Sequence, residues 1–453
     1  MLDTNTETVL RLIRNTTLEG RPETVAVIKN ALLDYLAASL AATPYEKVRQ
    51  IAAVSADGAA TATGKGSPLL GRAERTSDEL AAFYNGFQSH YLDYDDAQAN
   101  IAGHFSTVLF SVLFAVAKPE DTLIDFITAY AAGAELEGLL GARLNPQHKL
   151  QGWHSTGTIG PLGGAAAIIR LRNLPQDQAV RLLSMAATQS AGMGFESGSD
   201  VKPLHAGLAA RNAVFAYRLV QETQLSASEN IFNDATGWLN TIGNVPLDVE
   251  ALEADWQNPG QLLKPGLWLK LHPYCSAAIC GASACETIRG EMKTRNLQPK
   301  DIATVTFDFP PGADKALRYS KPVTGQEGRF SMEYVAWQEL WLGGVDDKLF
   351  LEPKMPDLFQ HLQDVGCFSR VHTLPKVAKD KRITKVAVHF TDGTDISVTE
   401  DAPKGSPDNP LTTDEIITKL VSATNHERAN AITDALGHWP SGTVGDVLNA
   451  LTK

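Results

Sequence analysis

The chain has 453 residues, of which 43% are hydrophobic and 20% charged, a composition typical of globular proteins that bury a large core. Its formal net charge of −12 argues against a nucleic-acid scaffold and against binding to an anionic membrane surface. The length is sufficient for two or three domains.

Cysteine usage and the start of the chain indicate a cellular setting. Cys275, Cys280, Cys285 and Cys367 form neither a disulfide framework nor a Cys-x-x-Cys zinc pattern, which predicts a reducing, cytoplasmic environment. The first residues lack a basic start followed by an apolar run, so we expect no secretion signal. No uncharged apolar run of about 20 residues occurs, so no membrane span is predicted.

The first part of the chain is predicted to be helical. Apolar residues recur at helical spacing, and the many small residues are typical of closely packed, buried helices. Ser77 is expected to cap one helix, whereas the Gly-, Ala-, Thr- and Ser-rich segment 58–72 is expected to be a loop or a short extended piece. Helices are predicted at residues 23–43, 46–54, 78–92, 103–117, 121–143, 158–172, 175–193 and 205–222.

After about residue 265 the hydrophobic residues recur at every second position, which predicts strands. Segments 302–309 and 383–390 alternate, and the second turns through Thr391-Asp392-Gly393 into 394–399 to form a hairpin. Helices are expected between the strands, at residues 274–294, 330–342 and 355–365.

These patterns predict a mainly α protein that consists of a large all-α helical domain and a smaller α+β lid domain. The helical domain is placed at residues 1–265 and completed by 405–453, and the lid at 266–404.

A lysine and a histidine stand close to the start of an alanine-rich helix, at Lys202 and His205. Pro203 is compatible with the first turn, so Lys202 is expected at a helix N-terminus, where exposed N–H groups and the helix dipole attract carboxylates. A desolvated lysine at such a position can act as a base. The alternative is an exposed lysine in front of a surface helix.

Three further polar clusters lie at or near predicted helix starts, and converging helix starts offer N–H donors to an anion. Lysines and histidines near carboxylates suit general acid/base chemistry on a carboxylate substrate. The clusters are Asp93 to Asp96 with His104, Lys149 with His154, and His272 with Cys275.

Each cluster also has a structural interpretation. Asp95 or Asp96 can cap a turn, His104 and His154 can be hydrogen-bonded structural histidines, and Cys275 can be a small core residue. Although the aspartates could bind a hard cation, their spacing lacks the glycine-containing loop of a calcium site, so no metal is predicted. Neither Gly-x-Gly-x-x-Gly nor a Walker A sequence occurs, so no cofactor is predicted either.

Six motifs give the chain a resemblance to the MmgE/PrpD family over nearly its whole length. In order they are Asp93-Tyr94-Asp95-Asp96, Gly103-His104, Gly152-Trp153-His154, Lys202-Pro203-Leu204-His205-Ala206-Gly207, Arg318-Tyr319 with Arg329-Phe330-Ser331, and Gly405-Ser406-Pro407-Asp408-Asn409-Pro410-Leu411. The family includes 2-methylcitrate dehydratase, cis-aconitate decarboxylase and iminodisuccinate epimerase. The resemblance implies a helical domain with a lid, a homodimer, and metal-free chemistry beside a carboxylate of a small di- or tricarboxylate.

The resemblance also implies roles for individual residues. Asp93, His104, His154, Lys202 and Tyr319 match positions that line the decarboxylase site. Lys202 is the expected base, and the opposing acid or base is expected to be Lys149, Tyr319 or His154. The residues expected to contact substrate are Asp93, His104, His205 and Cys275.

The reaction most favoured by the resemblance is an epimerisation of the iminodisuccinate type. Cys275 occupies the place of a decarboxylase histidine, and Ile279 that of a dehydratase histidine. Lys149 stands where the epimerase has a tyrosine opposite its lysine. The alternatives are a lyase of the 2-methylcitrate dehydratase or cis-aconitate decarboxylase type, and a non-catalytic polycarboxylate-binding protein.

Overall fold

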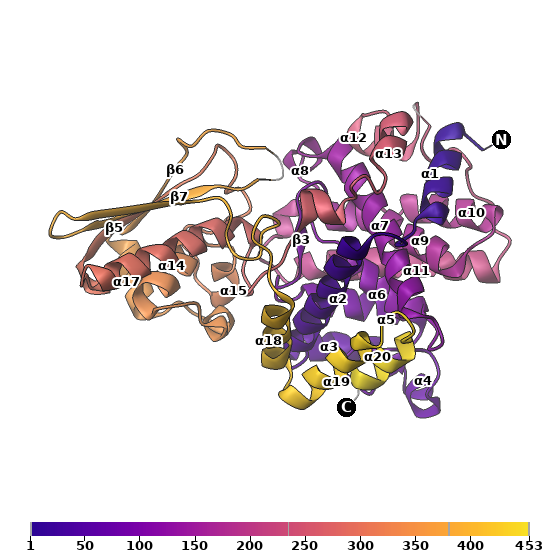
Figure 1. The fold of residues 1–453 in the computed structure, drawn as a ribbon, viewed down its shortest axis with the longest axis horizontal. Coiled ribbons are helices and arrows are strands. Elements are labelled where there is room, and N and C mark those ends of the chain that lie inside the picture. Colours follow the sequence, from indigo (N-terminus) through magenta and orange to yellow (C-terminus); the bar gives the residue numbers. More distant parts are fainter. Residues whose placement is uncertain (1, 234, 379–380, 452–453) are drawn as a thin grey trace. The chain divides into compact units, whose positions relative to one another are not determined.

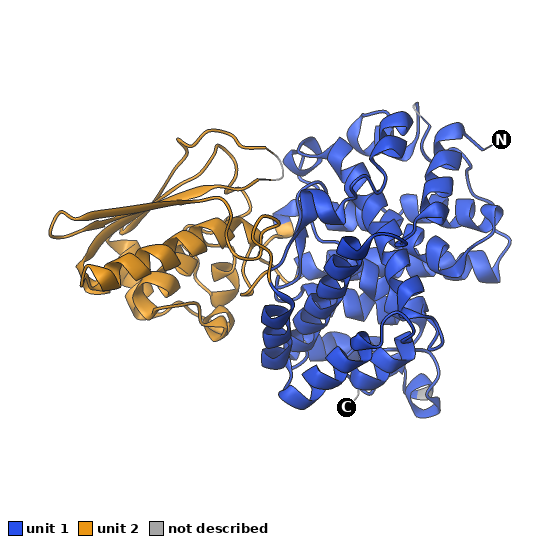
Figure 2. Cartoon of the chain, viewed as in Figure 1, with its two compact units in different colours: residues 1–195, 201–269, 412–453 blue, residues 196–200, 270–411 orange. Residues whose placement is uncertain are grey.

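The computed structural model describes residues 2–233, 235–378 and 381–451, and the chain divides into two compact units (Figures 1 and 2). Unit 1 comprises Met1–Phe195, Val201–Leu269 and Thr412–Lys453, and unit 2 comprises Glu196–Asp200 and Lys270–Leu411. Helix accounts for 57% of the residues and strand for 9%, which confirms the predicted mainly α fold with a small α+β part.

Unit 1 is built from helices, with two short antiparallel pairs, β1 (Ser67–Pro68) with β2 (Arg75–Thr76) and β3 (Ala97–Gln98) with β4 (Leu267–Trp268). Its helices are α1 (Thr4–Asn15), α2 (Pro22–Ala42), α3 (Glu46–Ser55), α4 (Gly58–Thr63), α5 (Asp78–His90), α6 (Ser106–Val116), α7 (Leu123–Leu144), α8 (Gln147–Leu150), α9 (Ser155–Arg172), α10 (Gln176–Ala187), α11 (Val201–Glu222), α12 (Trp238–Gly243), α13 (Val249–Asp255), α18 (Thr413–Ala423), α19 (His426–Gly437) and α20 (Val444–Leu451).

Helices α5, α6, α7, α9 and α11 form the centre of unit 1, with α11 packed on α5, α6 and α9. Small residues permit this packing, as the sequence predicted. A Cβ atom added to Gly86 of α5 would lie 2.9 Å from the Cα of Gly207 in α11, so the two backbones nearly touch. The close approach fixes the relative positions of the helix ends that carry the polar residues.

Several local predictions in unit 1 differ from the structure, among them the helix predicted at 175–193, which ends at Ala187 in α10. Helix α11 begins at Val201, four residues before the predicted start, because Pro203 fits into its first turn and leaves Lys202 inside the helix. The segment 58–72, predicted as a loop or a short extended piece, begins with the short helix α4, and its strand β1 pairs with β2 outside the segment.

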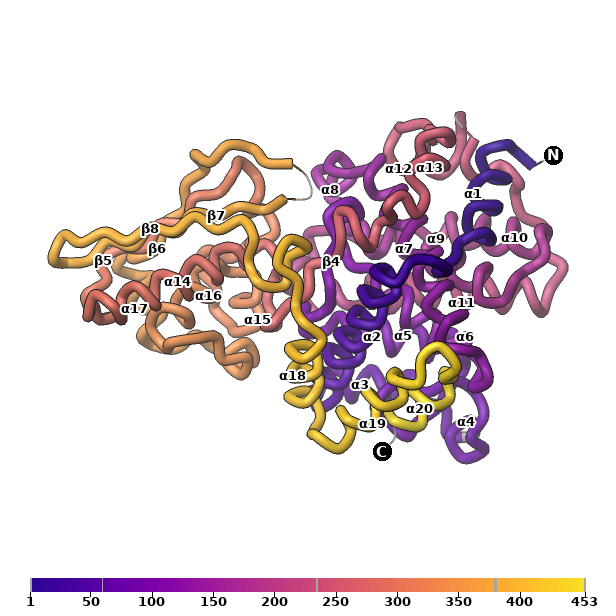
Figure 3. The backbone as a smooth tube through the Cα atoms, viewed as in Figure 1, coloured from indigo at the N-terminus to yellow at the C-terminus, as the bar shows by residue number. Residues whose placement is uncertain are grey.

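The C-terminal helix α18 packs against α2 near the start of the chain, and Figure 3 shows the two side by side. Among the residues that the structure describes, α2 is the one helix long and apolar enough to cross a membrane. However, 67% of its apolar window is buried inside the fold, as in the core helix of a globular unit.

Unit 2 contains a four-stranded sheet in the order β6-β5-β7-β8, with α14 (Ile279–Thr294) packed on β7 and β8 (Figure 1). The predicted strands are confirmed as β5 (Ile302–Asp308), β7 (Thr384–Phe390) and β8 (Asp395–Glu400), and β7 and β8 form the predicted hairpin. The edge strand β6 (Phe368–Val371) pairs in parallel with β5 and was not predicted, because four partly exposed residues give little alternation to detect.

The helices predicted in unit 2 begin later along the chain than expected, and α15 was not predicted. Helix α14 starts at Ile279 after a 3₁₀ turn at Ser276–Ala278, so Cys275 precedes the helix. The others are α15 (Gly325–Gly328), α16 (Met332–Trp337), which continues into a wider turn at Gln338–Leu342, and α17 (Asp357–Asp364).

A buried carboxyl group in unit 1 gives a test of the packing of α7 on α9. Glu137 is fully buried, and neither of its carboxylate oxygens has a hydrogen-bond partner among the described residues. Burial raises the pKa of Glu137 well above its usual range, so the folded state holds it as the neutral acid. Its contribution to stability is therefore complete at low pH and is lost as pH rises, because the unfolded state ionises first.

We expect the substitution Glu137→Gln to flatten this dependence. Between pH 6 and pH 9 the melting temperature of the variant should fall less than that of the parent, by roughly 3 °C. Thermal melting followed by circular dichroism measures both slopes. Parallel slopes would show that Glu137 binds the same number of protons in the folded and unfolded states over this range, and would contradict a neutral Glu137 in the fold.

Candidate active site

The ends of three packed helices bring polar side chains together in unit 1. His104 lies two residues before α6, His154 is the residue immediately before α9, and Lys202 is the second residue of α11. Because α6, α9 and α11 pack on one another, their N-terminal turns lie at one end of the helical layer. Unpaired backbone N–H groups at such ends favour an anion.

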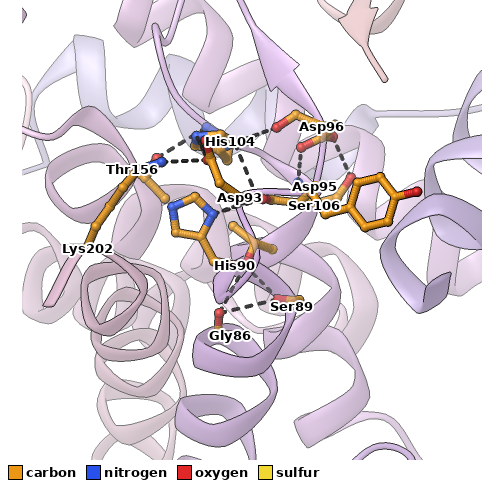
Figure 4. A network of polar contacts seen from close by, with 12 residues as sticks. Gly86, Ser89, His90, Asp93, Asp95, Asp96, His104, Ser106, Thr156 and Lys202 are labelled. Carbon is orange, nitrogen blue, oxygen red and sulfur yellow. Dashed lines mark hydrogen bonds and ion pairs between the residues drawn. The ribbon is translucent and has the colours of Figure 1, made fainter. Parts of the chain in front are cut away.

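Lys202 and Asp93 form a buried ion pair at the centre of this group (Figure 4). The Lys202 Nζ donates to Asp93 Oδ1 over 2.6 Å, and the two residues are 8% and 4% exposed. Asp93 follows the end of α5 with a φ of 52°, in the left-handed region that residues other than glycine seldom adopt. Such a conformation persists only where the surrounding contacts fix it.

His90, Asp95 and His104 form a second set of contacts beside the ion pair. The Nδ1 atom of His90 lies 2.9 Å from both carboxylate oxygens of Asp95, and His104 Nδ1 lies 3.3 Å from Asp95 Oδ2. Burial lowers the pKa of His90 to about 4, so the ring is neutral near pH 7. Burial alone would raise the pKa of Asp95, but His90 and His104 lower it well below its usual range.

The orientation of His104 is fixed from two sides. Its Nδ1 atom lies 2.5 Å from the backbone oxygen of Asp96, and its Nε2 atom lies 3.8 Å from Asp93 Oδ1. The Asp96 carboxyl group accepts from Ser106 Oγ over 2.6 Å, and burial raises the pKa of Asp96 to about 7. At pH 7 the acid-rich loop, Asp93 to Asp96, therefore holds an ionised Asp95 beside an Asp96 that is about half protonated.

His154 and His205 form a pair of imidazoles, with 2.9 Å between their Nδ1 atoms. Burial, with the positive charge of Lys202 as the next cause, lowers the pKa of His154 well below its usual range. His154 is therefore a neutral ring beside a cation. At this separation one Nδ1 donates and the other accepts, so each ring sets the tautomer of its neighbour.

The structure thus brings together five of the residues predicted for the site: Asp93, His104, His154, Lys202 and His205. It adds His90, which the sequence analysis missed although it stands five residues before Asp95 at the end of a predicted helix. Histidines flanking an acid-rich motif are a signal that could have identified it.

Lys149 lies on the short helix α8 with an exposed side chain. Its neighbour His148 is buried, makes a 2.7 Å hydrogen bond with Thr158 and stacks on the ring of Trp153. The catalytic role predicted for Lys149 stays a prediction.

Tyr319 and Cys275 belong to unit 2. The backbone N–H groups of Tyr319 and Cys275 donate to the carbonyls of Phe330 and Arg329, over 3.2 Å and 2.8 Å. The Tyr319 ring packs so closely on Gly198 that an added Cβ atom would lie 2.5 Å from it. Gly198 is part of 196–200, the segment of unit 2 that leads directly into α11 and so to Lys202.

Two overlapping sets of side chains have the spacing of metal ligands. Ligand atoms of His90, Asp93, Asp95 and His104 lie within 4.8 Å of one another, as do ring nitrogens of His90, His104 and His154. The Lys202 ammonium is already paired with Asp93 Oδ1, and it would repel a metal ion bound to that oxygen. The donor set therefore fits an ammonium better than a metal ion.

Comparison with known proteins gives two family matches and two relatives. Residues 10–247 match the MmgE/PrpD N-terminal domain, and residues 272–435 match the MmgE/PrpD C-terminal domain. A cis-aconitate decarboxylase of Mus musculus is 25% identical over 379 residues, which are 81% of this chain and 74% of that protein. A cis-aconitate decarboxylase of Homo sapiens is 25% identical over 367 residues, which are 79% of this chain and 73% of that protein.

Proposed function

Because the chain belongs to the MmgE/PrpD family, we propose that it is a lyase-type enzyme that removes a proton beside a carboxylate of a small di- or tricarboxylic acid. The observation that carries the proposal is the buried ion pair of Lys202 with Asp93, which has two neutral histidines beside it, His90 at the end of α5 and His154 immediately before α9. The two decarboxylase relatives support a lyase, because the similarity extends over most of this chain.

His154 is the general base in this proposal. Its low pKa leaves the ring unprotonated at neutral pH, so it can accept a proton from carbon. We assign the Nδ1 proton of His154 to the contact with His205, which leaves Nε2 as the basic atom. Lys202, the base expected from the sequence, instead donates to Asp93, and an ammonium has no lone pair with which to accept a proton.

Lys202 stabilises the negative charge that develops in the reaction. Removal of the proton gives the substrate carboxylate dianion-like character, and a cation with backbone N–H donors in a dry site lowers the energy of that state. In an elimination, the C–H electron pair forms the new C=C bond while the C–O bond to the leaving hydroxyl breaks. Lys202 then supplies the proton that converts the hydroxide into water.

Elimination agrees better with the described cluster than epimerisation does. Inversion requires a second acid or base on the opposite face of the carbon. Of the residues that the family resemblance offers for it, Lys149, which stands in the place of the epimerase tyrosine, has an exposed side chain. A decarboxylation like that of the relatives also begins beside a carboxylate, but releases CO₂ in place of water. A non-catalytic polycarboxylate-binding protein is the remaining alternative.

Incubation of the full chain with individual di- and tricarboxylic acids in deuterated water distinguishes these reactions by NMR. We expect a new alkene signal, with deuterium entering the substrate if proton removal is reversible. Deuterium incorporation with inversion would favour an epimerase, and release of CO₂ would favour a decarboxylase. Binding without exchange or product for any acid would contradict the proposed function.

A further inference from the structure

A buried lysine from the C-terminal part of unit 1 contacts the acid-rich loop of the site. Lys419 lies on α18, and its side chain is only 2% exposed. Its Nζ atom donates to Asp34 of α2 over 2.7 Å and to the backbone oxygen of Tyr94 over 2.8 Å. The same ammonium lies 3.7 Å from the centre of the Tyr94 ring, in the geometry of a cation–π contact.

Tyr94 stands between the two carboxylates that organise the site. Asp93 pairs with Lys202, whereas Asp95 contacts His90 and His104. The carbonyl of Tyr94 belongs to the same peptide group as the N–H of Asp95, so a bond to that carbonyl fixes the direction in which the chain continues to Asp95. The Lys419 contacts therefore hold the backbone between the two carboxylate side chains. The residue before Tyr94, Asp93, has a left-handed φ that only surrounding contacts can maintain.

The ion pair of Lys419 with Asp34 does not by itself explain the presence of a lysine. Desolvation offsets most of the attraction in a buried pair, and apolar residues of similar volume often replace such a pair without loss of stability. What an apolar side chain cannot supply is the N–H donor to the Tyr94 carbonyl and the charge over the Tyr94 ring. The part of Lys419 that is hard to replace is thus the part that faces the acid-rich loop.

We infer that Lys419 is a positioning residue that holds Tyr94, and through it Asp93 and Asp95, in the geometry in which Lys202 and the histidines react. Lys419 acts through the loop and has no contact with substrate in this inference. The inference rests on the proposed function for its kinetic consequence, but its structural consequence is independent of any reaction.

Three variants separate positioning from stability. Lys419→Met removes the donor and takes the ammonium away from Asp34, whereas Asp34→Asn keeps the donor and replaces the ion pair by a contact with a neutral amide. The double variant Asp34→Leu with Lys419→Met replaces both charges and should recover stability without recovering the bond to Tyr94. We expect kcat to fall about 10- to 100-fold in both variants that lack Lys419, with little change in KM, and less than threefold in Asp34→Asn.

The ring nitrogen signals of the histidines in ¹⁵N NMR provide a readout without activity. Signals of His90 and His104 should shift in both variants that lack Lys419 and remain near their parental values in Asp34→Asn. A double variant with parental stability, kcat and histidine signals would overturn the positioning role. If the parent turns over no acid, the proposed function fails, while the histidine signals still decide the role of Lys419.

Discussion

Replacing Lys202 by methionine should lower kcat/KM by about three orders of magnitude. Methionine retains most of the length of the side chain but removes the cation that stabilises developing charge in a buried site, where loss of one such group costs about 3–4 kcal/mol. The effect should fall mainly on kcat, because the interaction strengthens as charge develops on the substrate. Steady-state kinetics with the acid identified in deuterated water measures it.

The ion pair itself requires a control, because Lys202→Met removes the cation that is paired with the buried Asp93 carboxylate. The double variant Lys202→Met with Asp93→Asn removes that buried charge, so it should melt closer to the parent while staying inactive. Lys118→Met changes an exposed lysine of the same unit and should leave kinetics unaltered. A single Lys202→Met variant that is folded and retains more than a tenth of parental kcat/KM would exclude the proposed role.

Replacing His154 by glutamine should lower kcat by about two to three orders of magnitude, because the variant has no group at this position able to accept a proton from carbon. Glutamine can still make a hydrogen bond with His205, so the fall in kcat measures the loss of the basic nitrogen more than a change in packing. Deuterium exchange into substrate should fall in parallel with turnover. A variant that exchanges deuterium at the parental rate would show that another group is the base.

The pH profile of the parent enzyme tests the same assignment. A base works in its unprotonated form, and burial lowers the pKa of His154, so activity should persist as pH falls below 6.5 and decline only at lower pH. An ordinary exposed histidine would give a decline centred near pH 6.5. A profile of kcat/KM for the parent that falls by half near pH 6.5 would contradict a buried, neutral His154 as the base.

The amino-acid sequence determined the helical and strand periods, and with them the two kinds of unit. The small residues of the predicted helices indicated close packing between them, and the structure shows Gly86 of α5 against Gly207 of α11. The edge strand β6 escaped prediction because its pairing with β5, more than 60 residues away, stabilises it more than its own four residues do.

The sequence also indicated most of the candidate site, because Asp93, His104, His154 and Lys202 occur in motifs at predicted helix starts. It did not indicate their states of charge. Whether a histidine is a base or an acid depends on burial and on the nearest cation, and for His154 both are set by helices that meet only in the fold. The role that we propose for Lys202 differs from the expected one for the same reason, since its donation to Asp93 spans 109 residues of sequence.

Length, composition, periodicity and motif order therefore determined the fold class and the family resemblance, since these depend on neighbouring residues and on spacing along the chain. Only the tertiary structure decided which side chains form hydrogen bonds with one another and which form ion pairs. It brought His90 beside Asp95 and His104, and it brought Lys419 from the far end of the chain to Tyr94. Such contacts depend on distances of a few ångströms between distant segments, and packing of the whole helical unit sets those distances.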